Sequence, residues 1–211
     1  MNIVHTDLFY LPNLEYFCLV KDFGEIRIHL EDRYVKQTYR NRCEILLANK
    51  VEKLSVPVKE GKKNKPFRTM EIDYAQKWLH VHLRGIQSAY GKAPYFEYLY
   101  PELEAVFKKY HRFLWELNLD LLTICLRFLN ARAKLVMHDV SLPENGEVDL
   151  RGALDAKTEE LEREFYCIAP YTQVFGVDFV PNLSVIDLLF CQGPEAKYIL
   201  DRSIKKKLNN T

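Results

Sequence analysis

The sequence predicts an α/β protein with a Rossmann-like, mostly parallel sheet, a small hairpin and a helical part between about residues 74 and 129. Strand-like and helix-like segments alternate along the chain, which is typical of parallel sheets covered by helices. The chain has 211 residues, of which 48% are hydrophobic, and it contains no low-complexity tract. We therefore expect one domain over residues 1–211, with a single buried core.

The N-terminal segment predicts a strand, a turn and a helix in that order. Residues 3–10 form the first strand-like run, which Pro12 interrupts because proline has no amide hydrogen to donate. Asn13 is a suitable N-cap for a helix that reaches about Lys21. Residues 25–30 alternate apolar and polar side chains and predict the second strand.

A hairpin and a basic loop follow. The strand-like runs 43–48 and 51–58 are separated only by Asn49 and Lys50, which favours a hairpin. The lysine-rich stretch 58–68 flanks a glycine and a proline, and we expect it to be a solvated loop.

Two amphipathic helices and several shorter elements are predicted in the rest of the chain. Helical spacing within 74–90 predicts a core face made of Ala75, Leu79, Leu83, Ile86 and Tyr90. Helical spacing within 113–129 predicts a central buried helix. Later segments predict a strand at 133–138, a turn at 143–146, a charged helix at 157–163, a strand at 171–179 and a helix after 183.

Ser184 and Asp187 precede the last of these helices. Their spacing is that of a capping box, although a Ser nucleophile or a carboxylate base is the alternative interpretation. We favour the cap, because it satisfies backbone donors without a ligand, and Gly193 and Pro194 then end the helix.

The segment YVKQTYRNR, residues 34–42, is the first candidate for a binding site. It follows the second strand and is rich in hydrogen-bond donors, which are costly to bury unless an anion or carbonyl accepts from them. A solvated helix face is the alternative. The candidate substrate-binding residues of this segment are Lys36, Gln37, Arg40, Asn41 and Arg42.

The turn after the first strand, which contains Tyr10 and Asn13, forms one site with this segment if both lie at the carboxyl ends of strands. Ligands of parallel sheets collect at the carboxyl ends of the strands, so Tyr10 and Asn13 after the first strand are expected to face the same crevice as Lys36, Arg40 and Arg42. The helix N-terminus at Asn13 and these cations predict an anionic small-molecule ligand.

Trp78 and His82 are one turn apart on the predicted helix 74–90 and therefore lie next to each other. His80 and His82 point in different directions around the same axis, so they cannot chelate a metal together. His82 is the candidate catalytic acid or base, with Trp78 as a substrate-binding neighbour, and a packed core histidine is the alternative.

Composition excludes several classes of protein. The formal net charge of +1 argues against nucleic-acid binding through a large positive field. No apolar run reaches the roughly 18 residues that a membrane span requires, and we expect a cytoplasmic protein. The five cysteines are scattered and form no CxxC pair, so we expect reduced core cysteines and neither a metal nor an organic cofactor.

Several motifs in a fixed order resemble the WbqC-like family of bacterial proteins. They are FYLPNLEYF (9–17), YVKQTYRNRCEI (34–45), LSVPV (54–58), the Trp78 and His82 pair, APYFEY (93–98) and PNLSVIDLLFCQG (181–193). The first turn departs from the family pattern, in which a Gln-Pro pair is frequent, because this chain has Leu8, Phe9 and Glu15 there. The segment 137–165 is also shorter and more polar than in longer relatives.

The resemblance implies a role in bacterial surface polysaccharide, because the family is associated with O-antigen gene clusters. It implies a transferase that attaches an aminoacyl group such as glycine to a nucleotide-linked amino sugar. The ligand would be a nucleotide-sugar or an activated acyl donor, held by Lys36, Arg40 and Arg42. The alternative is a non-catalytic protein that binds an anionic metabolite or peptide in the same cleft.

Overall fold

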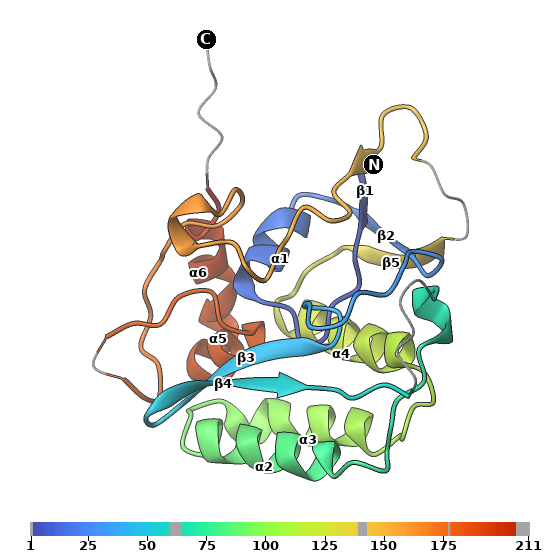
Figure 1. The fold of residues 1–211 in the computed structure, drawn as a ribbon. Coiled ribbons are helices and arrows are strands. Elements are labelled where there is room, and N and C mark those ends of the chain that lie inside the picture. Colours follow the sequence, from blue (N-terminus) through green and yellow to red (C-terminus); the bar gives the residue numbers. More distant parts are fainter. Residues whose placement is uncertain (1, 60–64, 139–142, 177, 206–211) are drawn as a thin grey trace.

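The computed structural model describes residues 2–59, 65–138, 143–176 and 178–205 (Figure 1). The strands are β1 (Ile3–Thr6), β2 (Glu25–His29), β3 (Arg42–Leu47), β4 (Lys50–Ser55), β5 (Lys134–His138) and β6 (Val148–Asp149). The helices are α1 (Leu14–Val20), α2 (Trp78–Tyr90), α3 (Phe96–Phe107), α4 (Leu114–Phe128), α5 (Val185–Gln192) and α6 (Ala196–Arg202). Short 3-10 turns are η1 (Phe67–Thr69), η2 (Glu160–Glu162) and η3 (Gly193–Glu195).

The main sheet has four parallel strands in the order β5-β2-β1-β6. Strands β3 and β4 form a separate antiparallel hairpin, joined by a tight turn at Ala48 and Asn49. The α/β class, the parallel sheet and the small hairpin are therefore confirmed. The N-cap at Asn13 is confirmed as well, because its Oδ1 accepts a hydrogen bond of 3.2 Å from the Tyr16 amide.

The two faces of the parallel sheet differ in chemistry. Val4, Ile26 and Ile28 are fully buried on one face, whereas His5 and Arg27 are paired in register on the other. The crossovers from β1 to β2 and from β2 to β5 step in the same direction, so right-handed connections place α1 and α4 on the same face. The second face can therefore carry polar side chains.

The hairpin packs on helix α2. Gly85 faces the hairpin so closely that a methyl group added there would lie 3.6 Å from Leu54 and 3.8 Å from Ile45. The buried face of α2 is rotated slightly from the predicted one, since Trp78 and His82 are buried while Leu79 and Leu83 are only half-buried. Ile86 and Tyr90 are buried as predicted, whereas Ala75 is exposed and lies before the start of α2.

Several predicted elements are wrong. The described part of 171–179 contains no strand, and 157–163 contains only the short turn η2. In the segment 171–179, the Gln173 side chain bonds to the backbone of Val180. It donates to the Val180 carbonyl at 2.9 Å and accepts from the Val180 amide at 2.9 Å. The sequence analysis also missed α3, which contains Pro101 in its interior, and α6.

The capping box at Ser184 and Asp187 is not formed. Ser184 occupies the N-cap position of α5, but its hydroxyl donates to the Leu11 carbonyl at 2.8 Å and makes no cap hydrogen bond. The Asp187 carboxylate instead accepts from Tyr171 Oη at 2.6 Å and from Gln173 Nε2 at 3.1 Å. Both side chains tie α5 to distant segments, which a local motif does not reveal.

Asp187 gives a pH-dependent prediction for stability. Its side chain is fully buried, and this burial raises its pKa above the ordinary value of 3.8 although three neighbouring side chains donate hydrogen bonds to it. A raised pKa in the folded state means that the protonated form favours folding, so stability is lost as the pH rises through the folded pKa. Asp187→Asn keeps the Oδ1 acceptor and should raise the urea midpoint at neutral pH, with the difference closing below about pH 4.

The control for this experiment is Asp178→Asn, because Asp178 is exposed and should leave the urea midpoint unchanged at every pH. A lower midpoint for Asp187→Asn at neutral pH would contradict the prediction. It would mean that the hydrogen bonds to the carboxylate outweigh the cost of burying its charge.

Candidate functional site

The carboxyl ends of β1, β2 and β6 form one edge of the sheet, which we call the carboxyl edge. The crossover from β1 leads toward β2, while β6 lies on the other side of β1, so a topological switch point lies between β1 and β6. Asp7 follows β1 and is 7% exposed. Its Oδ2 accepts from the Gly152 amide at 2.8 Å, which ties the end of β1 to the loop after β6.

Arg40 is held at this edge by contacts within the chain. Its guanidinium forms an ion pair with Asp7, donates to the Arg33 carbonyl and lies over the Phe67 ring at 5.7 Å. Asn118 of α4 donates to the Arg40 carbonyl at 2.8 Å and so fixes the backbone. The anion that sequence analysis expected to accept from Arg40 is thus a carboxylate of the protein.

Arg151 bridges the same edge on the side of β2. It pairs with Asp149 at 2.7 Å and with Asp32 at 3.4 Å. Partial burial raises the pKa of Asp32, and the positive charges of Arg151 and Arg40 oppose that rise. The carboxyl edge therefore holds alternating charges that are already paired with one another.

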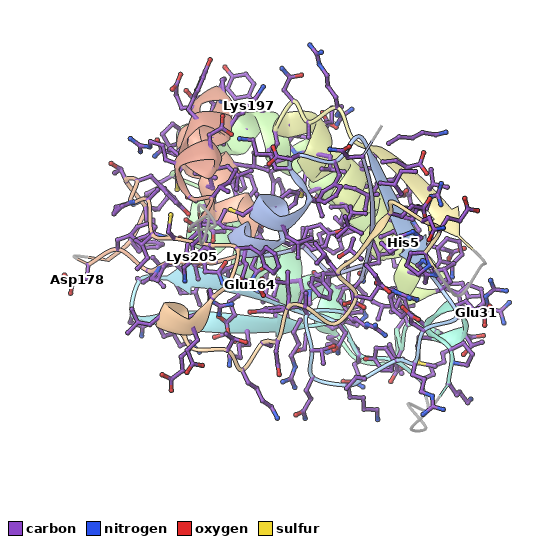
Figure 2. All side chains as sticks on the ribbon, turned by 90° about the horizontal axis from the view of Figure 1, so that it is seen from above. His5, Glu31, Glu164, Asp178, Lys197 and Lys205 are labelled. Carbon is purple, nitrogen blue, oxygen red and sulfur yellow. The ribbon has the colours of Figure 1, made fainter. Side chains whose placement is uncertain are left out.

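A chain of three side chains runs across the polar face of the sheet below this edge. His5 Nε2 lies 2.6 Å from Glu147 Oε2, and His5 Nδ1 lies 2.6 Å from His29 Nε2. We call Glu147, His5 and His29 the His5 network. His5 is fully buried, whereas 5% of His29 and 8% of the Glu147 side chain are exposed. Figure 2 shows His5 on the side of the molecule where Glu31 lies, away from Lys197 and Asp178.

Glu147 is held as a carboxylate. The Glu144 amide, His5 and Arg27 all donate to it and hold its pKa below the ordinary value, and Arg27 Nη1 lies 2.5 Å from Oε1. If Glu147 accepts the Nε2 hydrogen of a neutral His5, then His5 Nδ1 accepts from His29 Nε2. In that arrangement the two imidazoles and the carboxylate form one continuous hydrogen-bonded chain, with Glu147 at one end and His29 at the other.

Sequence analysis missed the His5 network. His5 and His29 lie in strands at positions that alternate with buried apolar side chains, and this alternation was the available signal. Glu147 lies 142 residues after His5. Its segment predicts only a turn, so nothing local to that segment indicates the contact.

A small basic cavity of about 170 Å³ lies beside the hairpin, and we call it the Arg42 pocket. Its lining residues are Gln37, Tyr39, Arg42, Cys43, Glu44, Lys53, Ala156 and Lys157. Three cationic side chains face one carboxylate, which itself pairs with Lys53 at 3.3 Å. Arg42 Nε is buried without a hydrogen-bond partner, and the Tyr34 hydroxyl nearby is in the same state. Such donors favour an anion in the pocket.

His82 lies in the core. Its Nδ1 is 2.8 Å from the Tyr10 hydroxyl, the Ser55 backbone provides a second partner, and the Trp78 ring lies 5.0 Å away, nearly perpendicular. Tyr10 is 0% and His82 2% exposed. Burial lowers the pKa of His82 to about 4, so its imidazole is neutral at neutral pH. These contacts correspond to the packed histidine that sequence analysis kept as the alternative.

The structure therefore does not bring the candidate residues into one crevice. Gln37 and Arg42 meet in the Arg42 pocket, and Lys36 next to them is exposed. Asn13 caps α1 from a buried position, and Asn41 Nδ2 donates to the Val56 carbonyl at 3.0 Å. Arg40 lies at the carboxyl edge, whereas Tyr10, Trp78 and His82 lie together in the core.

The described ranges contain neither a cluster of potential metal ligands nor a helix that could span a membrane. Among those residues, no three His, Cys, Asp or Glu side chains gather closely enough to hold a metal ion. None of the helices in those ranges is both long and apolar enough to cross a membrane.

Comparison with known proteins identifies the family. The sequence model of the WbqC-like protein family matches residues 9–167 and 153–199. The uncharacterized protein Rv1507c of Mycobacterium tuberculosis is 26% identical over 223 residues, which cover 89% of this chain and 92% of that protein. No solved structure matches the chain. The resemblance drawn from the motifs is confirmed, and the chain belongs to the WbqC-like protein family.

Proposed function

We propose that the protein is a cytoplasmic transferase of bacterial surface-polysaccharide (O-antigen) biosynthesis. Its reaction is the transfer of an aminoacyl group such as glycyl from an activated donor to the amine of a nucleotide-linked amino sugar. The family resemblance implies this class of reaction, and the His5 network is the observation that carries the proposal. A transferase of this kind needs a base near the acceptor amine, and the network supplies one at the carboxyl side of a parallel sheet.

The role of the network follows from the bonds that change. The sugar nitrogen attacks the acyl carbon, a nitrogen–carbon bond forms, and the bond from the acyl carbon to its leaving group breaks. The amine loses one proton, which His29 accepts and returns to the leaving group. His5 and Glu147 stabilise the protonated state of His29 through two hydrogen bonds of 2.6 Å, so they are positioning residues.

The Arg42 pocket is suited to the phosphate of the same substrate. Arg42 has a buried donor without a partner, while Lys53 and Lys157 supply further positive charge. A guanidinium can donate two parallel hydrogen bonds to phosphate oxygens. Gln37 and the exposed Lys36 extend this donor surface.

The second candidate function is a non-catalytic protein that binds an anionic metabolite or peptide. The Arg42 pocket favours it, because the pocket can bind an anion whether or not the His5 network reacts with anything. Binding without turnover distinguishes this function from the first. Thermal shift with nucleotide-sugars, acyl-CoAs and aminoacyl-adenylate analogues identifies the ligand class, since a ligand at about 100 times its Kd stabilises by roughly 2.7 kcal/mol.

The first prediction concerns turnover. His29→Gln and His5→Gln should each lower the rate of glycyl transfer to a nucleotide-linked amino sugar by roughly 10² to 10⁴-fold, because a general base contributes that much. Affinity for the nucleotide-sugar should change little. Mass spectrometry of the sugar after incubation with glycyl thioester or glycyl adenylate measures the product.

The control for turnover is His80→Gln, because His80 is exposed on α2 and faces away from the core. Full activity of both network variants would remove the network from the mechanism. Absence of product from the unaltered protein with every donor, together with nucleotide-sugar binding, would establish the second candidate function instead.

The second prediction concerns the Arg42 pocket. Arg42→Lys keeps the charge but loses the planar fork, so calorimetric affinity for a nucleotide-sugar should fall by about 1–3 kcal/mol. Arg84→Lys is the control, because Arg84 lies exposed on α2. Equal affinities of the two variants would mean that no phosphate is gripped at Arg42.

The third prediction concerns His82. His82→Gln should lower the free energy of unfolding by about 1–3 kcal/mol, because the Tyr10 hydroxyl and the Ser55 backbone are left without their buried partner. The kcat of the folded fraction should not change, since His82 is 2% exposed and packs in the core against Tyr10 and Trp78. A stable variant that has lost turnover would restore His82 as the catalytic base.

A further inference from the structure

A large pocket of about 660 Å³ lies away from the carboxyl edge. It is formed where α3, the C-terminal end of α4 and the junction of α5 with α6 meet, and its walls include Tyr95, Tyr98, Leu99, Phe128, Gly193 and Tyr198. We call it the tyrosine pocket. Lys197 also lines it, and Figure 2 shows Lys197 well separated from His5.

Exposed aromatic side chains surround this pocket. Tyr98 is 72% and Tyr198 63% exposed, and both lie at the wall of the same cavity. Leu99 and Leu129 are buried and give the pocket an apolar floor. Large exposed rings beside an apolar cavity are typical of a surface that stacks on a ligand.

Tyr95 is fixed in this wall by a close approach to the backbone. A methyl group added at Gly193 would lie 2.4 Å from the Tyr95 ring, so the ring occupies the space that any other side chain would fill. Gly193 also has a φ of +50°, which glycine adopts most readily. The Tyr95 amide donates to the Phe190 carbonyl at 3.0 Å. The ring is thus held in place before a ligand arrives.

The polar groups of the pocket suit a neutral ligand with hydroxyl groups. Helix α4 ends at Phe128, and the last carbonyls of a helix are acceptors that carry partial negative charge and disfavour anions. At the start of α3, the amides of Tyr95, Phe96 and Tyr98 already donate to carbonyls of the chain. Glu195 and Lys197 line the pocket with opposite charges, so their formal charges cancel.

We propose that the tyrosine pocket binds a neutral hexopyranose unit of an oligosaccharide. The C–H face of a pyranose ring stacks on tyrosine rings, and its hydroxyl groups donate to the Glu195 carboxylate and accept from Lys197. A nucleotide fits less well, because its phosphates would meet the negative end of α4 with a single lysine that Glu195 offsets. This inference does not depend on the proposed transferase reaction, since it concerns binding at a separate place.

The test uses three neutral trisaccharides as probes: maltotriose, chitotriose and mannotriose. Saturation-transfer difference NMR should detect binding of at least one of them to the unaltered protein. Tyr98→Ala and Tyr198→Ala should each weaken that binding by roughly threefold to tenfold, the loss expected when one aromatic contact is removed. Tyr98→Phe keeps the ring and should retain most of the affinity.

The matched control is Tyr110→Ala, because Tyr110 is 63% exposed, as Tyr198 is, but does not line the pocket. The proposal is overturned if none of the three probes binds, or if the two pocket variants bind as the control does. It is also overturned if uridine monophosphate binds in a Tyr98-dependent manner while the trisaccharides do not. These outcomes leave the transferase proposal untouched, because they measure no turnover.

Discussion

The pairing of Asp7 with Arg40 and with the Gly152 amide holds the carboxyl edge of the sheet together. One carboxylate joins the end of β1, the segment after β2 and the loop after β6, which are far apart in sequence. Removing one partner of such a pair is costly, because the other would remain charged and largely buried. Arg42, two residues after Arg40, lines the basic pocket beside the hairpin.

The elements that were predicted correctly are those whose signal is local. Asn13 caps α1 through a bond to Tyr16 three residues away, and the hairpin follows from two strand-like runs with a short turn. The alternation in β2 was also visible, because Ile26 and Ile28 face the core while Arg27 faces the polar side. What the alternation could not give is the partner of each polar residue. The contact between His29 and His5 depends on the order and register of the parallel strands. Glu147 lies in a segment whose sequence shows no strand or helix pattern.

Ser184 and Asp187 also show that a local pattern does not give the partners of polar side chains. The local motif predicts that the two residues satisfy the start of α5, which is the least demanding arrangement for an isolated helix. In the folded chain, Ser184 donates to the Leu11 carbonyl and Asp187 accepts from the Tyr171 hydroxyl, so neither side chain caps the helix. A motif read from spacing gives the position of a residue in a helix reliably, but its partners depend on what the fold brings near.

His5 and His82 show how much of a histidine's chemistry comes from its neighbours. Both are almost fully buried and each makes a close contact with a side chain that lies far away in sequence. His82 faces a phenol, a backbone group and an indole ring, none of which stabilises a positive charge enough to offset burial, and its pKa is therefore lowered to about 4. His5 faces a carboxylate that stays ionised through its own bonds to Arg27 and the Glu144 amide. The imidazole of His82 is therefore surrounded by uncharged groups, whereas the imidazole of His5 lies against a carboxylate, although both rings are buried to nearly the same extent.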